Sequence, residues 1–380
     1  MNEPLHPGLL PAGLGDLLPD DAAFEAEVVE QLMGRFAGFG YERVKPPLIE
    51  FEESLLSGAG AALASDTFRL MDPVSQRMIG LRADMTPQVA RIAATRLAKA
   101  PRPLRLCYAG QVLRVSGTQL RPERQFGQVG AELIGVAATA ADAEVIALAA
   151  EALQRLGVAA LSVDLTTPTL VPAVCRAFGL DAQTERRVRA AVDRKDAAAL
   201  DRAASSARAI LGRLLAACGP ADKALPALAD LPLPDEAARE VSALAEVVAA
   251  ARAVVPTLAI TIDPVENRGF EYHTGLSFTI FARGVRGELG RGGRYGIGFG
   301  HDEPATGFTL YTDTLLRAVP PPTPRRRVYL PAGTLPVQAA GLRADGWITV
   351  QGLDGAPSAS EARRLGCSHL LGPDGTPVAA

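Results

Sequence analysis

The sequence has few cysteines, and none of them lie close together. The four are Cys107, Cys175, Cys218 and Cys367, and no C-x-x-C motif occurs, which argues against a zinc site or a redox-active dithiol. Their wide spacing is typical of free, mostly buried thiols in a reducing compartment. We therefore expect no bound metal.

Long hydrophobic runs and an excess of charge are also missing. No stretch approaches the roughly 18 consecutive apolar residues of a membrane span, and the N-terminus MNEPLHPGLL lacks the basic start and apolar run of a signal peptide. The net charge is only −3, and no stripe of basic and aromatic residues stands out, which argues against nucleic acid as a partner. These absences favour a cytoplasmic protein that does not bind membranes.

The composition that remains is that of an ordinary globular protein. The chain has 380 residues, of which 48% are hydrophobic and 21% charged, enough for two or three domains with a large core. Residues 1–168 and 257–318 contain strand-like runs with helix-like runs between them. Residues 319–380 begin with the proline-rich stretch VPPPTP and continue as a small βαβ-type unit.

Residues 169–256 differ from the segments on either side. They are rich in alanine, leucine and arginine and contain almost no aromatic residues, which predicts a helical insertion. Four prolines are expected to divide it into short helices: Pro220, Pro226, Pro232 and Pro234. The predicted fold is thus α+β, with a mainly antiparallel sheet flanked by helices, one helical insertion and a small C-terminal α/β unit.

A strand-to-helix junction carries polar residues of the kind that form ligand sites. In LRADMTPQVAR, residues 81–91, Arg82 and Asp84 precede a helix. Thr86 is the expected N-cap of this helix and Pro87 suits its first position.

A second junction follows a glycine-rich segment. GGRY at 292–295 precedes ATGFTLYTDTLL at 305–316, which predicts a strand that runs into a helix. The start of that helix carries Asp313 and Thr314 and no cation, so it is poorly suited to an anionic ligand.

Several stretches together resemble the catalytic core of histidyl-tRNA synthetase, a class II aminoacyl-tRNA synthetase. The opening GLGDLLPDD…KPPLIE is similar to its first helix and dimer-forming first motif, and LRADMTPQVAR to its LRPEGT segment. YAGQVLRVSGTQLRPERQFGQVGAE resembles the second motif, NRGFEYHTG the histidine-recognition stretch, and GGRYGIGFG…ATGFTL the third motif. The resemblance covers about residues 10–318 and implies a class II synthetase-like sheet.

Two departures from that family concern the site for a triphosphate, which requires fixed cations. Residues 114–117 read Arg-Val-Ser-Gly where the synthetase has Arg-His-Glu-Arg, and Thr314 stands where its third motif ends in an arginine. The sequence therefore predicts that ATP is not used to activate an amino acid. The last 55 or so residues are also about half of what a full anticodon-binding domain would need.

This pattern is similar to the synthetase-like family of regulatory subunits of ATP phosphoribosyltransferase. The resemblance implies a subunit that makes no bond itself, contains no cofactor and assembles with a short-form catalytic subunit, which condenses ATP with phosphoribosyl pyrophosphate. It further implies a role in histidine biosynthesis and in feedback inhibition by histidine. The similarity of residues 41–50 to the class II dimer motif implies self-association as a dimer.

The same resemblance implies a histidine pocket. Its residues match the family motifs directly at six positions: Thr86, Arg114, Gln128, Glu132, Arg268 and Tyr295. Asp84 stands where the synthetase has a glutamate, and His273 where it has a tyrosine. These substitutions change the detailed contacts that a histidine would make.

Each group of an amino acid then has candidate partners in the pocket. Asp84 and Glu132 would accept from the ammonium, and Thr86 would bond either end. Arg114 and Arg268 would hold the carboxylate. The imidazole would be oriented by Gln128 and Tyr272, with Tyr295 closing over it.

Two other functions are compatible with the same motifs. One is a histidyl-tRNA synthetase with diverged motifs, which would still catalyse histidine-dependent ATP–pyrophosphate exchange. The other is an RNA-binding or interaction module that has kept the fold alone, which strong and salt-sensitive tRNA binding would reveal.

Overall fold

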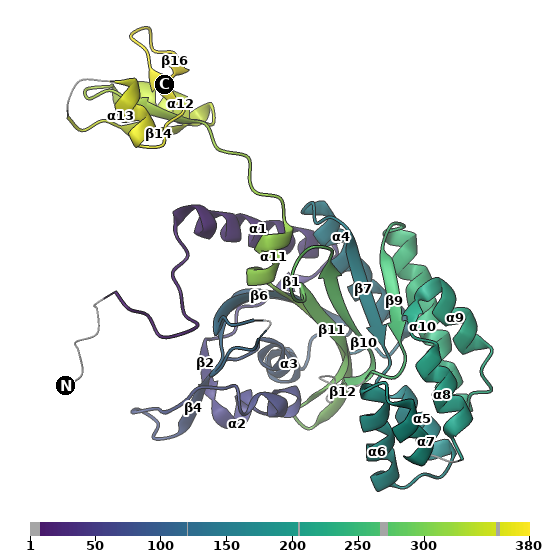
Figure 1. Ribbon diagram of the computed structural model, residues 1–380. Helices are drawn as coiled ribbons and strands as arrows, with labels where there is room; N and C mark the ends of the chain where they lie inside the picture. The colour runs from purple at the N-terminus through teal and green to yellow at the C-terminus, as the bar shows by residue number, and fades with distance from the viewer. Residues whose placement is uncertain (1–7, 120, 204–205, 267–272, 355–357) are drawn as a thin grey trace, which may run out of the picture. The chain divides into compact units, whose positions relative to one another are not determined.

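The computed structural model describes residues 8–119, 121–203, 206–266, 273–354 and 358–380. The chain divides into two compact units, residues 1–320 and 321–380, and each is described separately. Figure 1 shows the large sheet of the first unit with helices on both sides of it. This arrangement confirms the predicted class II synthetase-like α+β fold.

The large sheet orders its described strands as β1-β5-β6-β12-β11-β10-β7-β9-β8. Neighbours from β5 to β7 are antiparallel, whereas β7 and β9 are parallel. In sheet order the strands are β1 Glu42–Arg43, β5 Leu104–Leu113, β6 Gln125–Ile134, β12 His301–Tyr311, β11 Gly290–Gly298, β10 His273–Ala282, β7 Leu161–Thr166, β9 Ala259–Asp263 and β8 Gly219–Pro220.

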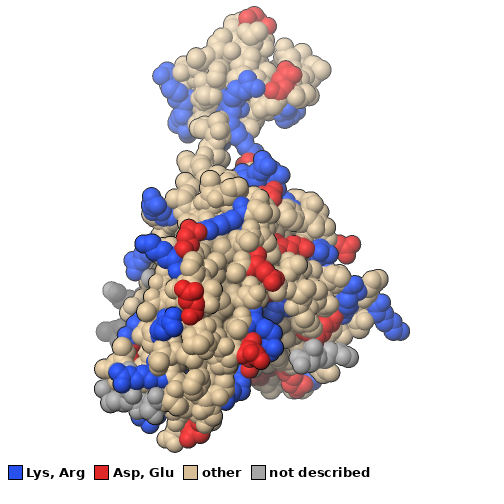
Figure 2. Space-filling model, turned by 90° about the vertical axis from the view of Figure 1, so that its right-hand side faces the viewer, with Lys and Arg blue, Asp and Glu red and all other residues tan. Residues whose placement is uncertain are grey.

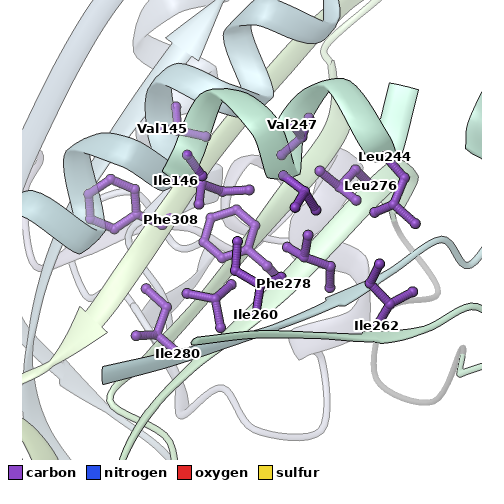
Figure 3. Close-up of a cluster of buried hydrophobic side chains, with 14 of the residues drawn as sticks. Val145, Ile146, Leu244, Val247, Ile260, Ile262, Leu276, Phe278, Ile280 and Phe308 are labelled. Atoms are coloured by element: carbon purple, nitrogen blue, oxygen red, sulfur yellow. The ribbon is translucent and has the colours of Figure 1, made fainter. Parts of the chain in front are cut away.

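One face of this sheet carries the main hydrophobic core. Helices α1 (Pro19–Gly38), α4 (Thr139–Arg155) and α10 (Asp235–Val254) contribute to it. Figure 3 shows Ile146 of α4 and Val247 of α10 above Phe278 of the sheet. Because these side chains recur at helical spacing on one side of each helix, they are removed from water together when the helix packs on the strands.

The opposite face is covered in part by α3 (Thr86–Thr95). A second cluster there joins Val89 and Ala90 of this helix to Tyr108, Tyr295 and Ile297 of the sheet. The helix begins at Thr86, and its predicted N-cap role is wrong: the cap position is Met85, and the Asp84 carboxylate accepts from the Thr86 backbone N–H at 2.8 Å. The polar residues of the junction therefore lie between α3 and the sheet.

A small antiparallel sheet, α2 and a short 3-10 helix lie beside α3. The sheet has the order β2-β4-β3. The bounds are β2 Ile49–Phe51, α2 Glu52–Leu55, η1 Gly58–Leu63, β3 Arg69–Met71 and β4 Met78–Leu81.

The predicted insertion is helical, with two exceptions to the prediction. Pro226 lies inside α9 rather than at a break, and Gly219–Pro220 form β8, which pairs with β9 and so extends the large sheet. The helices are α5 Leu170–Ala177, α6 Ala182–Asp193, α7 Ala197–Ala203, α8 Arg208–Ala216, α9 Ala221–Ala229 and α10. After the third-motif strand β12, α11 (Thr312–Ala318) ends the first unit.

The second unit is a small α/β structure, as predicted. Its sheet has the order β14-β13-β15-β16, with β13 parallel to β14 and β15. Helix α12 packs on one cluster, around Val328 and Leu330, and α13 on another, around Tyr329. The elements are β13 Arg327–Leu330, α12 Pro336–Ala344, β14 Ile348–Gln351, α13 Ala359–Arg364, β15 His369–Leu371 and β16 Pro377–Ala379. Among the described helices of both units, none is both long and apolar enough to cross a bilayer.

Candidate functional site

Glu132 lies at the centre of the candidate site, two residues before the end of β6. Its side chain is 1% exposed, and three hydroxyl groups donate to the carboxyl group. Thr86 Oγ1 and Tyr108 OH lie 3.0 and 3.2 Å from Oε1, and Tyr295 OH lies 2.9 Å from Oε2. Burial raises the pKa of Glu132 to about 8, although these hydroxyl donors favour the ionised form.

A glycine opposite Glu132 makes room for this carboxyl group. Gly307 of β12 is the register partner of Glu132, and a Cβ added there would overlap Oε2. Gly130 plays the same part for the hydroxyl of Tyr108, which a Cβ at that position would also overlap. Glycines of the third and second motifs thus provide the space in which the buried polar groups meet.

Asp84 is fixed next to Glu132 by the residues around it. Its Oδ1 accepts from the Thr86 N–H at 2.8 Å and its Oδ2 from Gln128 Nε2 at 2.7 Å. Thr86 therefore joins the two carboxyl groups, since its hydroxyl donates to Glu132. The two acids and this threonine are held as one hydrogen-bonded group.

Gln128, on β6, holds Asp84 through a hydrogen bond. It is fully buried, and its Oε1 accepts from the Met85 N–H at 2.9 Å while its Nε2 donates to Asp84. Both ends of the amide are used within the protein. These two hydrogen bonds fix the positions of Asp84 and Met85.

Arg82, at the start of the same junction, also serves the structure. Its guanidinium is buried and donates to the carbonyl oxygens of Gln111 at 2.8 Å and Pro46 at 3.1 Å. It thereby ties residues 45–48 to the segment that carries Asp84 and Thr86.

A cavity of about 40 Å³ opens against these groups. It brings together five of the predicted residues, namely Asp84, Thr86, Glu132, His273 and Tyr295, and adds Arg291, Thr309 and Tyr311. His273 and Tyr295 face each other as register partners on β10 and β11. The remaining predicted residues of this stretch, Arg268 and Tyr272, lie outside the described residues.

A second cavity of about 330 Å³ adjoins the first, and Arg291 lines both. Arg114 lies here rather than in the first cavity, with its guanidinium 5.2 Å from the centre of the Phe126 ring. Glu123, Glu288 and Thr314 line it as well. By the sequence resemblance, this is the region in which the synthetase holds its triphosphate.

The cations of this second cavity are largely paired with carboxylates of the same chain. Arg121 donates to Asp313 at 2.9 Å and lies 3.8 Å from Glu288. Both carboxylate oxygens of Glu288 accept hydrogen bonds from Arg291 Nη2, at 2.7 and 2.8 Å. Sequence reasoning missed Arg121 and Arg291, although the loop GTQLRPE and the segment GRGGRY carry them.

The hydroxyl group of Thr314 is used within α11. Its side chain is buried, and its hydroxyl donates to the carbonyl oxygen of Tyr311 at 3.3 Å. Over the residues that the structure describes, no group of three or more His, Cys, Asp or Glu side chains is arranged to hold a metal ion.

Known proteins resemble this chain over nearly its full length. The family model for histidyl-tRNA synthetase matches residues 13–315. The chain is 61% identical over 376 residues to the ATP phosphoribosyltransferase regulatory subunit of Paramagnetospirillum magneticum, covering 99% of each chain. It is 62% identical over 372 residues to the protein of the same name from Rhodospirillum centenum, covering 97% of this chain and 96% of the other.

Two solved structures share the fold. A protein from Bacillus halodurans, described as an ATP phosphoribosyltransferase regulatory subunit/histidyl-tRNA synthetase, superposes with a TM-score of 0.81 at 24% identity, over 94% of this chain and 97% of that one. Histidyl-tRNA synthetase from Nostoc superposes with a TM-score of 0.80 at 19% identity, over 97% of this chain and 92% of that one. At such identities the likeness shows the fold alone.

Proposed function

Because the chain belongs to the family of ATP phosphoribosyltransferase regulatory subunits, we propose that it is the non-catalytic subunit of that enzyme. In this role it assembles with a short-form catalytic subunit for the first step of histidine biosynthesis and makes no bond itself. Relatives that share nearly its full length and more than half of its residues carry this name.

The main support for proposing that this subunit is non-catalytic is the ion pair between Arg121 and Asp313. A triphosphate needs cations that are free to meet it. In the cavity beside Thr314, Arg121 is held by Asp313 and Arg291 by Glu288. A triphosphate would have to displace these carboxylates and meet their repulsion, so ATP activation of an amino acid is not expected.

We propose histidine as the ligand of the first cavity. Asp84 and Glu132 offer acceptors for the nitrogens of histidine. Arg114 and Arg291 line the second cavity, and Arg291 lines the first as well, so a histidine carboxylate that extends toward the second cavity would meet a guanidinium group. The volume of about 40 Å³ holds only a few water molecules. Histidine binding therefore requires side chains that line the cavity to move apart.

Self-association is proposed through the segment that follows α1. Several large apolar side chains are exposed there on the small sheet and next to it: Leu48, Ile49, Leu70, Met71 and Met78. A groove of about 650 Å³ lined by Pro46, Ile49 and Ile92 lies beside them. Burying such a surface against a second copy would remove it from water.

The face of the molecule that carries the helical insertion gives no comparable reason to propose nucleic acid as a partner. Figure 2 shows basic and acidic side chains interspersed on the face that carries the helical insertion. Such a distribution does not form the single-signed patch that phosphate backbones select. We propose a cytoplasmic location, in keeping with the expected substrates.

The test is to mix the full chain with a short-form catalytic subunit. The two should co-elute, and phosphoribosyl transfer to ATP should rise when this chain is added. Histidine should lower the activity of the mixture. The chain alone should give no histidine-dependent ATP–pyrophosphate exchange, since a positive exchange would identify a synthetase instead. Failure of both co-elution and stimulation would refute the regulatory role.

A further inference from the structure

A third cavity lies between the C-terminal ends of α1 and α4. It has a volume of about 250 Å³, and its lining includes Gln31, Gly34 and Arg35 of α1 and Arg155, the last residue of α4. It shares none of its described lining residues with the two cavities around the candidate site. Both helices belong to the main-core face of the large sheet, whereas Thr86 of α3 reaches Glu132 from the opposite face. The third cavity is therefore separate from the candidate ligand site.

Two guanidinium groups line this cavity without a partner. Arg35 and Arg155 are exposed, and over the residues that the structure describes neither has a hydrogen bond or an ion pair. Glu30 lines the cavity as well, but its carboxylate accepts from Arg43 at 2.9 Å. The described acid of the cavity is thus already paired, and the donors of both arginines are open to a group from outside.

The helix dipole explains a cation at each of these helix ends, but it does not explain the rest. A positive charge in the last turn of a helix is stabilised by the partial negative charge of the terminal carbonyl groups. That interaction requires neither the several donors of a guanidinium group nor a hollow between two such groups. A carboxylate, by contrast, uses these donors through two parallel hydrogen bonds. The pair of arginines therefore suits a carboxylate better than it suits the helix ends alone.

Gly34 leaves space in the same cavity that the chain itself does not use. A glycine inside a helix is less stable than an alanine there. A Cβ added at Gly34 would meet no described heavy atom within 4 Å, whereas one added at Gly307 would overlap the Glu132 carboxyl group. Gly307 thus makes room for a group of the same chain. At Gly34 the open space is available to a group from another molecule.

A carboxylate on a protein segment matches these features better than a small free anion does. Both arginines are exposed, so salt would screen their attraction for a small anion. A protein segment adds apolar contact, because Ala152 and the buried Leu156 also line the cavity. The missing side chain at Gly34 lets such a segment approach α1 closely. Complementary charge then fixes its position.

On the basis of the function proposed above, we propose that this cavity binds a segment of the short-form catalytic subunit that carries an aspartate or a glutamate. The carboxylate of that residue lies between Arg35 and Arg155, and the neighbouring residues of the segment pack on Gly34 and Leu156. The cavity shares no described lining residue with the apolar groove proposed above for self-association. The chain can therefore hold a second copy and its catalytic partner at the same time.

The experiment is calorimetric titration of the short-form catalytic subunit into the full chain, at low and at high salt. The variants are Arg35→Glu, Arg155→Glu and Gly34→Gln, each compared with the natural chain. The matched control is Arg187→Glu, which makes the same change of charge at an exposed position of α6 in the helical insertion. Titration of histidine into each variant and its thermal unfolding serve as tests of the fold.

Each of the three cavity variants should bind the catalytic subunit at least about tenfold more weakly than the natural chain. A glutamate at Arg35 or Arg155 would meet the carboxylate of the partner, and a glutamine at Gly34 would fill the space that the segment occupies. High salt should weaken binding of the natural chain more than that of the two arginine variants, which have already lost the screened attraction. Arg187→Glu should bind like the natural chain, and all variants should keep their response to histidine.

Three results would overturn this inference and leave the proposed function in place. One is unchanged affinity of Arg35→Glu and Arg155→Glu for the catalytic subunit. Another is an equal loss in Arg187→Glu, which would show an effect of net charge alone. The third is dissociation of copies of the chain in the arginine variants, with unchanged binding of the catalytic subunit, which would make the cavity a contact between copies.

Failure of the proposed function gives a different result. If the natural chain itself does not bind the catalytic subunit, the regulatory role is refuted, and this inference with it. If a glutamate variant does not fold, Arg35→Gln and Arg155→Gln decide, because they remove the cations without adding a negative charge. Binding by these two variants that equals binding by the natural chain at low salt would then overturn the inference, and weaker binding would support it.

Discussion

Arg121 and Asp313, which are 192 residues apart in the sequence, form an ion pair of 2.9 Å across the cavity beside the third motif. Their side chains are only 10% and 11% exposed, and the Arg121 guanidinium also lies 3.8 Å from the centre of the Tyr311 ring. The pair closes the second-motif loop onto the first turn of α11. Arg121, one of the cations that line this cavity, is thus held by a carboxylate of the same chain.

Removing Asp313 should therefore cost stability. Asp313→Asn leaves Arg121 with Glu288 at 3.8 Å as its nearest carboxylate, and we expect a loss of about 1–3 kcal/mol in the free energy of unfolding, measured by urea denaturation. The control is Glu236→Gln in the exposed Arg176–Glu236 pair, for which the change should stay within about 0.5 kcal/mol. Equal effects in the two variants would contradict the structural importance of the buried pair.

The space for Glu132 depends on the absence of a side chain at position 307. Gly307→Ala should push the carboxyl group away from Tyr295 and Thr86, because the new methyl group would overlap Oε2. We expect histidine binding to be lost in calorimetry and the free energy of unfolding to fall by about 1–3 kcal/mol.

Gly34→Ala, in α1, is the matched control for Gly307→Ala. Its added Cβ meets nothing within 4 Å, so helix stability should rise by about 0.5–1 kcal/mol and histidine binding should be unchanged. Loss of binding in both variants would show that the effect at Gly307 is not local.

The resemblance of several motifs to histidyl-tRNA synthetase predicted the fold and proposed the residues around Glu132. Asp84, Thr86 and Tyr295 line the same cavity as Glu132, as that resemblance implies. What the motifs did not predict depends on partners distant in the chain. Gln128 was assigned to an imidazole, yet its amide is taken up by Asp84 and by the Met85 N–H.

The same limit applies to Arg121 and Arg114. Arg121 lies in a polar loop, and only the position of Asp313 far along the chain gives it a role. Arg114 was placed with the other pocket residues, but its side chain lines the neighbouring cavity. Strand β8 was missed because two residues, Gly219 and Pro220, give no period-two pattern that could reveal a strand.

The two units should fold independently. Residues 321–380 have their own hydrophobic clusters, around Val328 and around Tyr329, and the first unit has its own core. A chain that ends at Pro320 should keep its thermal unfolding midpoint within about 2–4 °C and its affinity for histidine. Whether it still stimulates the catalytic subunit then tests the role of the C-terminal unit directly, and a failure to fold would show that the cores depend on each other.

Glu240, on α10, predicts a pH effect on stability that is separate from the ligand site. Burial raises its pKa to about 7, against the opposing effect of the Thr169 hydroxyl, which donates to it at 2.8 Å. As the pH rises from about 4.5 to 7, the unfolded chain loses this proton before the folded chain does. The folded state then binds more protons, so its stability falls through this window and stays lower above it.

Glu240→Gln cannot ionise and should escape this loss. Between pH 5 and pH 8, the natural chain should lose on the order of 1 kcal/mol relative to the variant, a value reduced by the partial exposure of the site. Urea denaturation at pH 5 and pH 8 measures these free energies of unfolding. The control is Glu246→Gln, at an exposed position of the same helix, which should show the same change between the two pH values as the natural chain. If the free energy of unfolding of Glu240→Gln changes with pH as it does in the natural chain, Glu240 is already ionised in the folded state at pH 5. Burial then does not raise the pKa of this residue.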